Sequence, residues 1–441
     1  MPCRELFSPR YRTCEGPMSA ASHDVMTPPG AIGEFRRSWA ALTAVTVGIA
    51  IGVGVLPTYV NGLVIPELEA EFGWSRTALS ALPLIGSLII IATAPVVGVV
   101  VDRFGVRIPA VSSLVAFAAG YFLLAYSNSS FGQYLLMFIV MYLLAAASTA
   151  VAFTRTINER YDRARGLALG IALSGAGVVG FLVPSVVGPV IADNWRTGYR
   201  ILAVVILLCA VVVAALMPRR TAKTAAALPR HPGGRGLVLE LIRQPRFWRL
   251  AIAFLTLALA VGGMLQHLFP MLRDAGVSAA AAARTASLVG VAVIIARIVV
   301  GLLVDRFFAP RVAALVLVVS AAGYVALLAG GPAFAAFAGI GVGLASGAEV
   351  DIIGNLTSRY YAIESYGRVF GIFYATFFLG FGSSPLLVAW LRSLTSDYTL
   401  PILMSVALML VAAALLFTAP RFPGEAPADV TNDATVLPAA P

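Results

Sequence analysis

Two ionisable side chains, Arg297 and Glu349, lie deep inside long apolar runs of this sequence. Arg297 comes eight residues before Asp305, which ends its run, and a helical rise of about 1.5 Å per residue puts it about 12 Å from that end. Glu349 comes ten residues before Arg359, a similar depth of about 15 Å. A charge at the centre of a membrane costs about 2.5–3.5 kcal/mol on insertion scales. We therefore predict that Arg297 attracts an anionic solute and that Glu349 carries a proton, with a permanent ion pair between them as the alternative.

Other polar residues are candidates for the same pathway. His267 comes eighteen residues after Arg249, near the opposite end of its run, and an imidazole titrates close to neutral pH. It could therefore carry a proton or contact the solute, or it could be an interface residue at a helix end. The uncharged side chains that could line a cavity are Tyr59, Asn61 and Tyr142.

A polar group near the end of one run has helical spacing. Asp351, Asn355 and Arg359 are spaced at i, i+4 and i+8, so they share one face of a helix. Glu349 and Asp351 are two positions apart, about 200° around the helix, so we do not expect both to face one cavity. The spacing predicts that the Asp351 group stabilises an inner gate, with direct contact to the solute as the alternative.

Membrane-spanning helices must position these residues. The 441-residue chain is 59% hydrophobic and 12% charged, with a mean hydropathy of +0.90, whereas soluble proteins are about 45–50% apolar and about 25% charged. A span of about 20 residues crosses a hydrocarbon core of about 30 Å. We predict an all-α integral membrane protein with twelve transmembrane helices. The predicted spans are 39–61, 77–99, 108–127, 131–154, 165–191, 199–217, 248–269, 279–304, 311–330, 332–357, 367–391 and 399–418.

Lysine and arginine residues are unevenly divided between the two sides of this predicted bundle. Of 31, 24 lie in segments on the side of the termini, six lie on the other side, and one is Arg297. This bias predicts a plasma (inner) membrane protein with both termini cytoplasmic. The positive charge is thus explained by topology and contact with anionic lipid, and not by binding of nucleic acid. The predicted segments are a tail over 1–38, a six-helix half over 39–217, a linker over 218–247, a second six-helix half over 248–418 and a tail over 419–441.

A ten-residue loop between the second and third runs has a partial copy in the second half. The copies are Gly98-Val-Val-Val-Asp-Arg-Phe-Gly-Val-Arg107 and Gly301-Leu-Leu-Val-Asp-Arg-Phe-Phe-Ala-Pro310. We expect Gly98 and Gly301 to let helix ends pack closely and Gly105 to allow a tight reversal. Asp102 needs a cationic partner, for which Arg155 at the end of the fourth run is the candidate. The other charged residues of the copies are Arg103, Arg107 (which can reach an anionic leaflet surface), Asp305 and Arg306.

The pattern G-x-x-x-D-R-x-G-x-R between two spans resembles the signature loop of the major facilitator superfamily. The two copies of this loop are 203 positions apart in the sequence, and a second repeat has nearly the same offset, 201 positions. Its members are Gly166, Gly170 and Pro184, which recur as Gly367, Gly371 and Pro385. The resemblance implies the major facilitator fold of two pseudo-symmetric six-helix halves, with a binding site near mid-membrane at their seam and transport by alternating access.

Three further stretches resemble bacterial relatives of the monocarboxylate and oxalate/formate porters. They are Glu71-Phe-Gly-Trp-Ser-Arg76, His267-Leu-Phe-Pro-Met-Leu-Arg-Asp-Ala-Gly276 and Gly347-Ala-Glu-Val-Asp351. The resemblance implies a proton-coupled secondary transporter of a small organic anion. This chain departs from the family pattern where Thr58 replaces a lysine and Val293 replaces an acid one turn before Arg297. A proton-driven exporter of a neutral or cationic drug-like solute and a non-transporting membrane sensor therefore stay open as alternatives.

No motif of an enzyme is present in the sequence. It has no Walker loop and no cluster of metal ligands, with histidines only at positions 23, 231 and 267. Its glycine-rich stretches lie in apolar runs and its three cysteines imply no disulfide framework. We expect no cofactor and no metal, and we expect a monomer whose partners are a small-molecule substrate, protons and the bilayer.

Overall fold

The computed structural model describes residues 31–162, 164–219 and 242–422, and this part of the chain is helical with short connections. The first group of elements is α1 (Ala31–Ile51), α2 (Leu56–Phe72), α3 (Arg76–Ser80), α4 (Leu82–Phe104), α5 (Arg107–Leu124), α6 (Phe131–Ala145), η1 (Ala146–Ser148), α7 (Ala150–Arg160), α8 (Arg165–Leu182), the π-helical η2 (Val183–Val187), α9 (Gly188–Asp193) and α10 (Trp195–Leu216). The second is α12 (Pro245–Asp274), α13 (Ala279–Arg306), α14 (Ala309–Gly330), η4 (Gly331–Phe334), α15 (Ala335–Tyr360), α16 (Ile363–Thr395) and α17 (Thr399–Phe417). Most of the predicted tails and linker, at 1–30, 220–241 and 423–441, lies outside the described residues.

Eleven helical stretches in the described part of the chain are long and apolar enough to cross a membrane. One of them, Ala309–Tyr360, has 52 residues and would be about 78 Å long if straight, more than twice a hydrocarbon core of about 30 Å. It divides at Gly331, whose φ of 62° suits glycine, into α14 and α15, which pack side by side. The described chain therefore contains the twelve predicted spans and is an all-α, multi-pass membrane protein.

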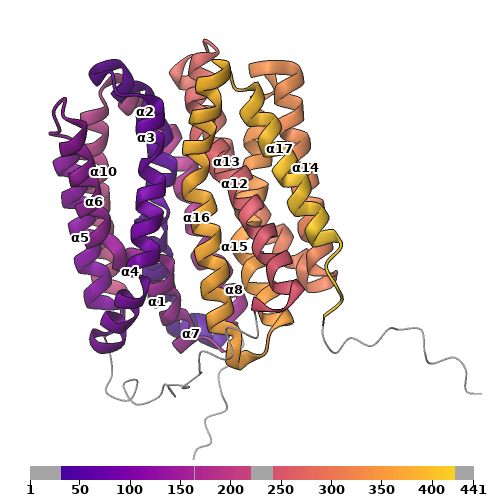
Figure 1. Ribbon diagram of the computed structural model, residues 1–441. Coiled ribbons are helices and arrows are strands. Elements are labelled where there is room, and N and C mark those ends of the chain that lie inside the picture. Colours follow the sequence, from indigo (N-terminus) through magenta and orange to yellow (C-terminus); the bar gives the residue numbers. More distant parts are fainter. Residues whose placement is uncertain (1–30, 163, 220–241, 423–441) are drawn as a thin grey trace, which may run out of the picture.

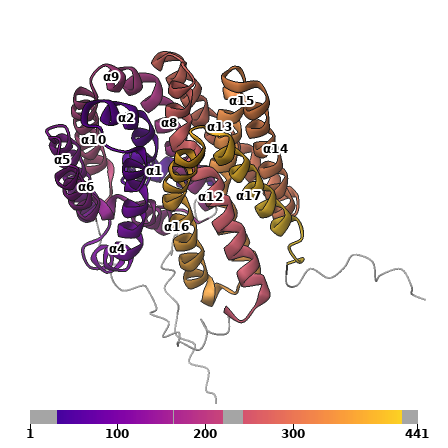
Figure 2. The same cartoon turned by 45° about the horizontal axis from the view of Figure 1, so that its top comes forward.

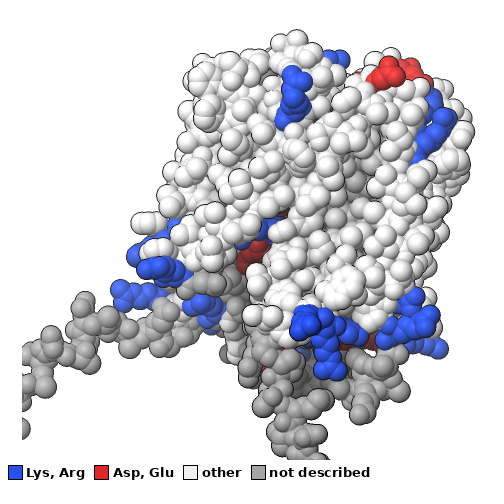
Figure 3. All heavy atoms as spheres, turned by 180° about the vertical axis from the view of Figure 1, so that it is seen from behind, with Lys and Arg blue, Asp and Glu red and all other residues white. Residues whose placement is uncertain are grey.

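The spans form two groups of six. Those of α1–α10 lie together in the indigo-to-magenta half and those of α12–α17 in the red-to-yellow half (Figure 1 and Figure 2). The described chain begins and ends at the same end of the bundle, which is lower in Figure 1 and is called the lower end; the opposite end is the upper end. Basic side chains gather near the lower end (Figure 3), the distribution on which the predicted orientation depends.

The two halves meet mainly where α2 packs on α12, α4 on α16 and α8 on α13. At two of these contacts glycine lets one backbone touch another. A Cβ at Gly62 would lie 2.2 Å from the carbonyl oxygen of Gln266, and a Cβ at Gly290 would lie 2.1 Å from the backbone nitrogen of Phe181. Small residues allow this close packing of membrane helices. The halves are therefore in direct backbone contact along part of their seam.

Replacing Gly290 with valine is expected to lower the melting temperature of the purified protein. The added side chain would overlap the backbone of α8, and overpacking of this kind costs about 1–3 kcal/mol. Gly301→Val in the same helix is the matched control, because a Cβ there meets no described atom within 4 Å. Thermal unfolding in detergent, followed by circular dichroism, measures the difference. Equal melting temperatures for the two variants would contradict a tight contact at Gly290.

The start of α1 is tied to the connection between α7 and α8. The carboxylate of Glu34 accepts hydrogen bonds from the backbone N–H groups of Asp162 and Ala164, at 3.3 and 3.1 Å. The ring of Phe35 lies against that of Tyr161, with 5.3 Å between centroids. Polar residues ahead of the first predicted span therefore belong to the folded half.

Candidate functional site

A cavity of about 470 Å³ lies at the seam between the two halves. Both halves line it, mainly with α1, α2, α4, α7 and α8 on one side and α13, α15 and α16 on the other. Its wall on α16 runs from Gly367, one turn above the lower end of that helix, to Phe381, about 21 Å further along. Figure 3 shows a hollow between the halves with basic and acidic atoms recessed in it. The cavity therefore lies where the repeat symmetry predicts a binding site.

Arg297 on α13 and Glu349 on α15 both line this cavity, as their depths in the sequence predict. The Arg297 side chain is only 6% exposed, and its Nε has no partner among the described residues. Glu349 is also buried; its Oε1 accepts a hydrogen bond from the Ser346 hydroxyl at 3.4 Å, whereas Oε2 has no described partner. A buried polar group without a partner costs about 1–3 kcal/mol. Arg297 and Glu349 thus each hold one buried polar atom that no described residue satisfies.

The direct partner of Arg297 is Asp351. Nη1 of Arg297 donates to both carboxylate oxygens of Asp351, at 3.1 and 3.2 Å. Glu349 lines the cavity and Asp351 does not, in agreement with the prediction that they do not both face it, and the described residues show no Arg297–Glu349 ion pair. Arg297 reaches Asp351 because α13 approaches α15 closely: a Cβ at Gly347 would lie 2.7 Å from the backbone oxygen of Val293. At this distance the long arginine side chain reaches the face that carries Asp351 as well as the cavity.

Asn355 and Arg359 do not join Asp351 in a hydrogen-bonded group within the described structure. The guanidinium of Arg359 lies over the ring of Phe422, 5.3 Å from its centroid. The Oδ1 atom of Asn355 is buried without a partner in this part of the chain. The three residues share one face of α15, but Asp351 and Arg359 contact different neighbouring segments, Asp351 through Arg297 and Arg359 through Phe422.

Of the three uncharged side chains predicted to line the cavity, one does so and two do not. Tyr59 lines the cavity, whereas Asn61 and Tyr142 do not. The ring of Tyr142 packs on α4, 2.4 Å from the position of a Cβ on Gly86. Hydroxyl groups that the sequence reasoning missed also line the cavity, because isolated serines and threonines in apolar runs give no signal. They belong to Thr58, Ser148, Thr149 and Ser346.

At the lower end, two predictions for the first signature loop are confirmed. Asp102 and Arg155 form the expected ion pair, and Arg155 also donates from Nε to Glu159 at 3.0 Å. Gly105, with a φ of 76°, follows α4 and makes the tight reversal into α5. This loop is therefore fixed to α7.

Gly98 and Gly301 do not pack closely in this conformation, so that prediction is wrong for it. A Cβ at either position would meet no described atom within 4 Å. Each lies one helical turn below a residue that lines the cavity, Ala94 on α4 and Arg297 on α13. Both glycines therefore face the part of the seam that is open.

The other charged residues of the two loops have varied surroundings. Arg103 lies over the ring of the next residue, 5.4 Å from its centroid. Arg107 donates to the carbonyl oxygen of Ala214 at 2.5 Å, so it connects α5 to α10 instead of extending toward lipid. Arg306 is exposed, and the side chain of Asp305 lies outside the described residues.

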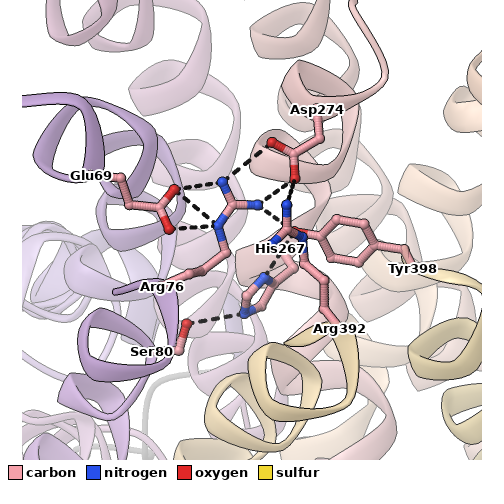
Figure 4. A network of polar contacts seen from close by, with 7 residues as sticks. All are labelled: Glu69, Arg76, Ser80, His267, Asp274, Arg392 and Tyr398. Atoms are coloured by element: carbon pink, nitrogen blue, oxygen red, sulfur yellow. Dashed lines mark hydrogen bonds and ion pairs between the residues drawn. The ribbon is translucent and has the colours of Figure 1, made fainter. Parts of the chain in front are cut away.

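A second group of charges joins the halves at the upper end (Figure 4). Arg76 of the first half, whose side chain is 10% exposed, donates to Glu69 at 2.9 Å and to Asp274 of the second half at 2.5 Å. Asp274 also accepts a hydrogen bond from Arg392 at 2.8 Å. These contacts connect the two halves at the upper end of the seam. The upper cluster, as it is called below, consists of Glu69, Arg76, Ser80, His267, Asp274, Arg392 and Tyr398.

His267 belongs to the upper cluster and does not line the cavity. Its Nε2 lies 3.0 Å from the carbonyl oxygen of Pro385, which can only accept, so Nε2 carries the hydrogen. Nδ1 is then an acceptor, and the Tyr398 hydroxyl lies 3.4 Å from it. Burial raises the pKa of the Tyr398 phenol to about 12, so at neutral pH this hydroxyl keeps the hydrogen that it donates. Across the seam, the Ser80 hydroxyl lies 3.3 Å from Nε2, and the Tyr398 hydroxyl accepts a hydrogen bond from Arg76 at 2.9 Å, so His267 supports the contact between the halves.

The sequence reasoning missed most of the upper cluster. Glu69, Asp274 and Arg392 are visible as charges at the ends of apolar runs, and Arg76 closes a family-like stretch. The sequence alone does not indicate which interhelical loops of the two halves meet across the seam. The available signal was that all four belong to the side with few basic residues.

A bundle of twelve apolar helices in two halves, with a charged cavity at the seam, defines a membrane transporter. The chain belongs to the Major Facilitator Superfamily, whose family model matches residues 42–350 and 270–439. Its fold and its relatives are those of transporters and not of enzymes.

Three relatives illustrate the similarity. The chain is 27% identical to the uncharacterized MFS-type transporter YhjX of Escherichia coli, over 79% of this chain and 85% of that protein. It is 24% identical to monocarboxylate transporter 13 of Bos taurus, over 90% and 93%. A crystallised bacterial homolog of the human lysosomal transporter Spinster, inward-facing and occupied, is 17% identical and superposes with a TM-score of 0.65, over 87% of this chain and 97% of that one. The last similarity shows the shared fold.

Proposed function

We propose that this chain is a proton-linked secondary transporter that carries an organic carboxylate by alternating access. The observation that carries the proposal is the partly unpaired guanidinium of Arg297 beside the partly unpaired carboxyl group of Glu349 in one seam cavity. The name monocarboxylate transporter among the relatives supports this substrate class.

Arg297 is the binding group for the carboxylate. Both hydrogen bonds that the described residues accept from it come from Nη1, which leaves the edge formed by Nε and Nη2 for a ligand. A guanidinium edge binds a carboxylate through two parallel hydrogen bonds. Tyr59 of the first half lines the same cavity as Arg297 and Glu349, so a solute held there contacts both halves.

The charges in the cavity link solute binding to a proton. Arg297 is one cation beside two carboxyl groups, Asp351 and Glu349. An entering carboxylate adds a further negative charge at a buried site, which is unfavourable while Glu349 is ionised. Protonation of Glu349 and binding of the anion therefore favour each other, and by linkage each raises the affinity for the other to the same extent. A solute that moves with its proton follows from this coupling.

The two ends of the seam act as alternating gates. We place the lower end in the cytoplasm of a plasma (inner) membrane protein because basic residues are concentrated there. The cavity then faces the cytoplasm while the upper cluster holds the outer side closed. Opening the outer side requires Arg76 and Asp274 to separate, and closing the inner side brings together the walls that carry Gly98 and Gly301.

Replacing Glu349 with glutamine tests the coupling. Glutamine resembles the protonated acid but cannot release a proton, so uptake driven by a pH gradient is expected to fall by at least about tenfold, while exchange of labelled for unlabelled solute continues. Proteoliposomes with an imposed pH gradient measure the first activity and counterflow measures the second. Binding of a carboxylate by the wild type should tighten as pH falls, and the variant should lose this dependence.

Glu67→Gln is the control, because it removes a carboxyl group from α2 outside the cavity lining. Full pH-driven accumulation by Glu349→Gln would remove this residue from the coupling. Binding of organic cations that tightens as pH rises would favour a proton-driven exporter instead. Binding of a carboxylate without accumulation would favour a sensor.

A further inference from the structure

One wall of the seam cavity is a row of aromatic rings on α16. The aromatic row, as it is called here, consists of Phe370, Tyr374, Phe377, Phe378 and Phe381, all of which line the cavity. Positions 370, 374 and 378 recur at i, i+4 and i+8 and so share one face of the helix. The rings of Phe370 and Tyr374 are stacked, with centroids 5.5 Å apart and planes 18° apart. Tyr374 and Phe378 are 4.7 Å apart.

These rings contrast with a neighbouring aromatic residue of α16, which lies three positions after Phe370. Phe373 is fully buried and packs on Phe247 and Phe254 of α12, so it belongs to the core of the second half. Phe370, Tyr374, Phe378 and Phe381 are only partly buried. Apolar surface that faces an accessible cavity is unfavourable unless a ligand covers it. The aromatic row is therefore positioned as a binding surface.

The first half lines the cavity with both aliphatic side chains and hydroxyl groups. The aliphatic ones include Ile49, Ile90 and Leu173, and the hydroxyl groups include those of Thr58, Ser148 and Thr149. Tyr374, Arg297 and Glu349 line the same cavity, so the aromatic row and the charged pair are open to the same solute. The cavity therefore combines a carboxylate-binding group with an apolar slot that is bounded on one side by flat rings.

We propose, on the basis of the transport function inferred above, that the preferred substrate is an aromatic monocarboxylate, with its carboxylate on the free edge of Arg297 and its ring on the aromatic row. A three-carbon acid would satisfy Arg297 and leave the apolar slot unfilled. The volume of about 470 Å³ falls within the range of about 300–1,000 Å³ that is usual for pockets of drug-sized ligands. Offset stacking on Tyr374 or Phe378 favours a planar ring over a saturated ring of equal size.

Four probes test this assignment by calorimetric titration of the purified full-length protein at one pH. Phenylacetate carries both recognised features, cyclohexylacetate replaces the planar ring, lactate lacks a ring, and phenylacetamide lacks the charge. We expect phenylacetate to bind about tenfold more tightly than lactate and about threefold more tightly than cyclohexylacetate, and phenylacetamide not to bind. Equal affinities for the three carboxylates would overturn the inference.

Two variants locate the ring. Phe378→Leu is expected to weaken phenylacetate binding by about three- to tenfold, a larger loss than for lactate, whereas Phe378→Tyr keeps the ring and should keep the affinity. Phe122→Leu on α5, outside the cavity, is the control for loss of any exposed ring. Unchanged phenylacetate affinity in Phe378→Leu would contradict a role for the aromatic row.

Failure of this inference is distinguishable from failure of the proposed function. If lactate and phenylacetate bind equally and both accumulate in response to a pH gradient, the transport function stands and the aromatic preference is wrong. If no carboxylate binds, both are wrong.

Discussion

Replacing Arg297 with glutamine is expected to reduce carboxylate uptake by at least about 100-fold. Removing one partner from a buried, charge-assisted contact costs about 3–5 kcal/mol, and 1.4 kcal/mol corresponds to a factor of about ten in affinity. Arg297→Lys keeps the charge but loses the planar guanidinium edge that donates two parallel hydrogen bonds, so we expect an intermediate loss of carboxylate uptake of about tenfold. Uptake of labelled phenylacetate or lactate into proteoliposomes, together with their dissociation constants, measures both effects.

A double variant separates solute binding from a structural role of Arg297. Arg297→Gln alone leaves Asp351, whose side chain is 32% exposed, without its cation, so lower activity could reflect damage to the fold. Arg297→Gln combined with Asp351→Asn replaces the ion pair by two neutral amides and is expected to restore the melting temperature without restoring uptake. Recovery of uptake in the double variant would show that Arg297 only neutralises Asp351.

Replacing Asp274 with asparagine is expected to shift the protein toward a conformation that is open at the upper end. Asp274 accepts hydrogen bonds from Arg76 across the seam and from Arg392, so its loss leaves two arginines facing each other. Its side chain is 32% exposed, so we assign about 1–2 kcal/mol to the change, between an exposed ion pair and a buried one. This corresponds to a population shift of about five- to thirtyfold.

Thiol labelling measures that shift. A cysteine at Leu265, which lines the top of the cavity, is introduced after replacing Cys3, Cys14 and Cys209 with serine. A membrane-impermeant maleimide added from the upper side should react about five- to thirtyfold faster in the Asp274→Asn background. Asp397→Asn is the control, because Asp397 lies at the same end and, among the described residues, its carboxylate accepts a hydrogen bond within its own half, from the backbone N–H of Thr399. Equal labelling rates would rule out the upper cluster as a gate.

The fold follows from the sequence because its strongest signals are local. Apolar runs of fixed length give the spans, and the glycine pair Gly330 and Gly331 lies at the predicted break between two of them. Depth within a span is also encoded, because residues can be counted from its charged end, and this is why Arg297 and Glu349 were correctly assigned to one cavity. The sequence does not show that α1 begins at Ala31, ahead of the predicted span, because Glu34 is polar and gives no apolar signal, although its carboxylate is held by the fold.

Contacts between helices could not be obtained in the same way. Helical phase separates Asp351 from Glu349, but it does not report how closely α13 approaches or how far an arginine reaches. The upper cluster depends on which loops of the two halves meet, and that is a property of the assembled bundle. The aromatic row was visible as spaced phenylalanines, but core packing and cavity lining give the same periodicity.

The bond between Glu34 and the α7–α8 connection bears on how the protein should be shortened for experiments. Two amide hydrogens, on Asp162 and Ala164, have their acceptor in a residue that precedes the apolar part of the chain. A deletion that starts the protein at its first hydrophobic stretch would remove this acceptor and loosen a connection more than a hundred positions away. Affinity tags and protease sites therefore belong upstream of Ala31.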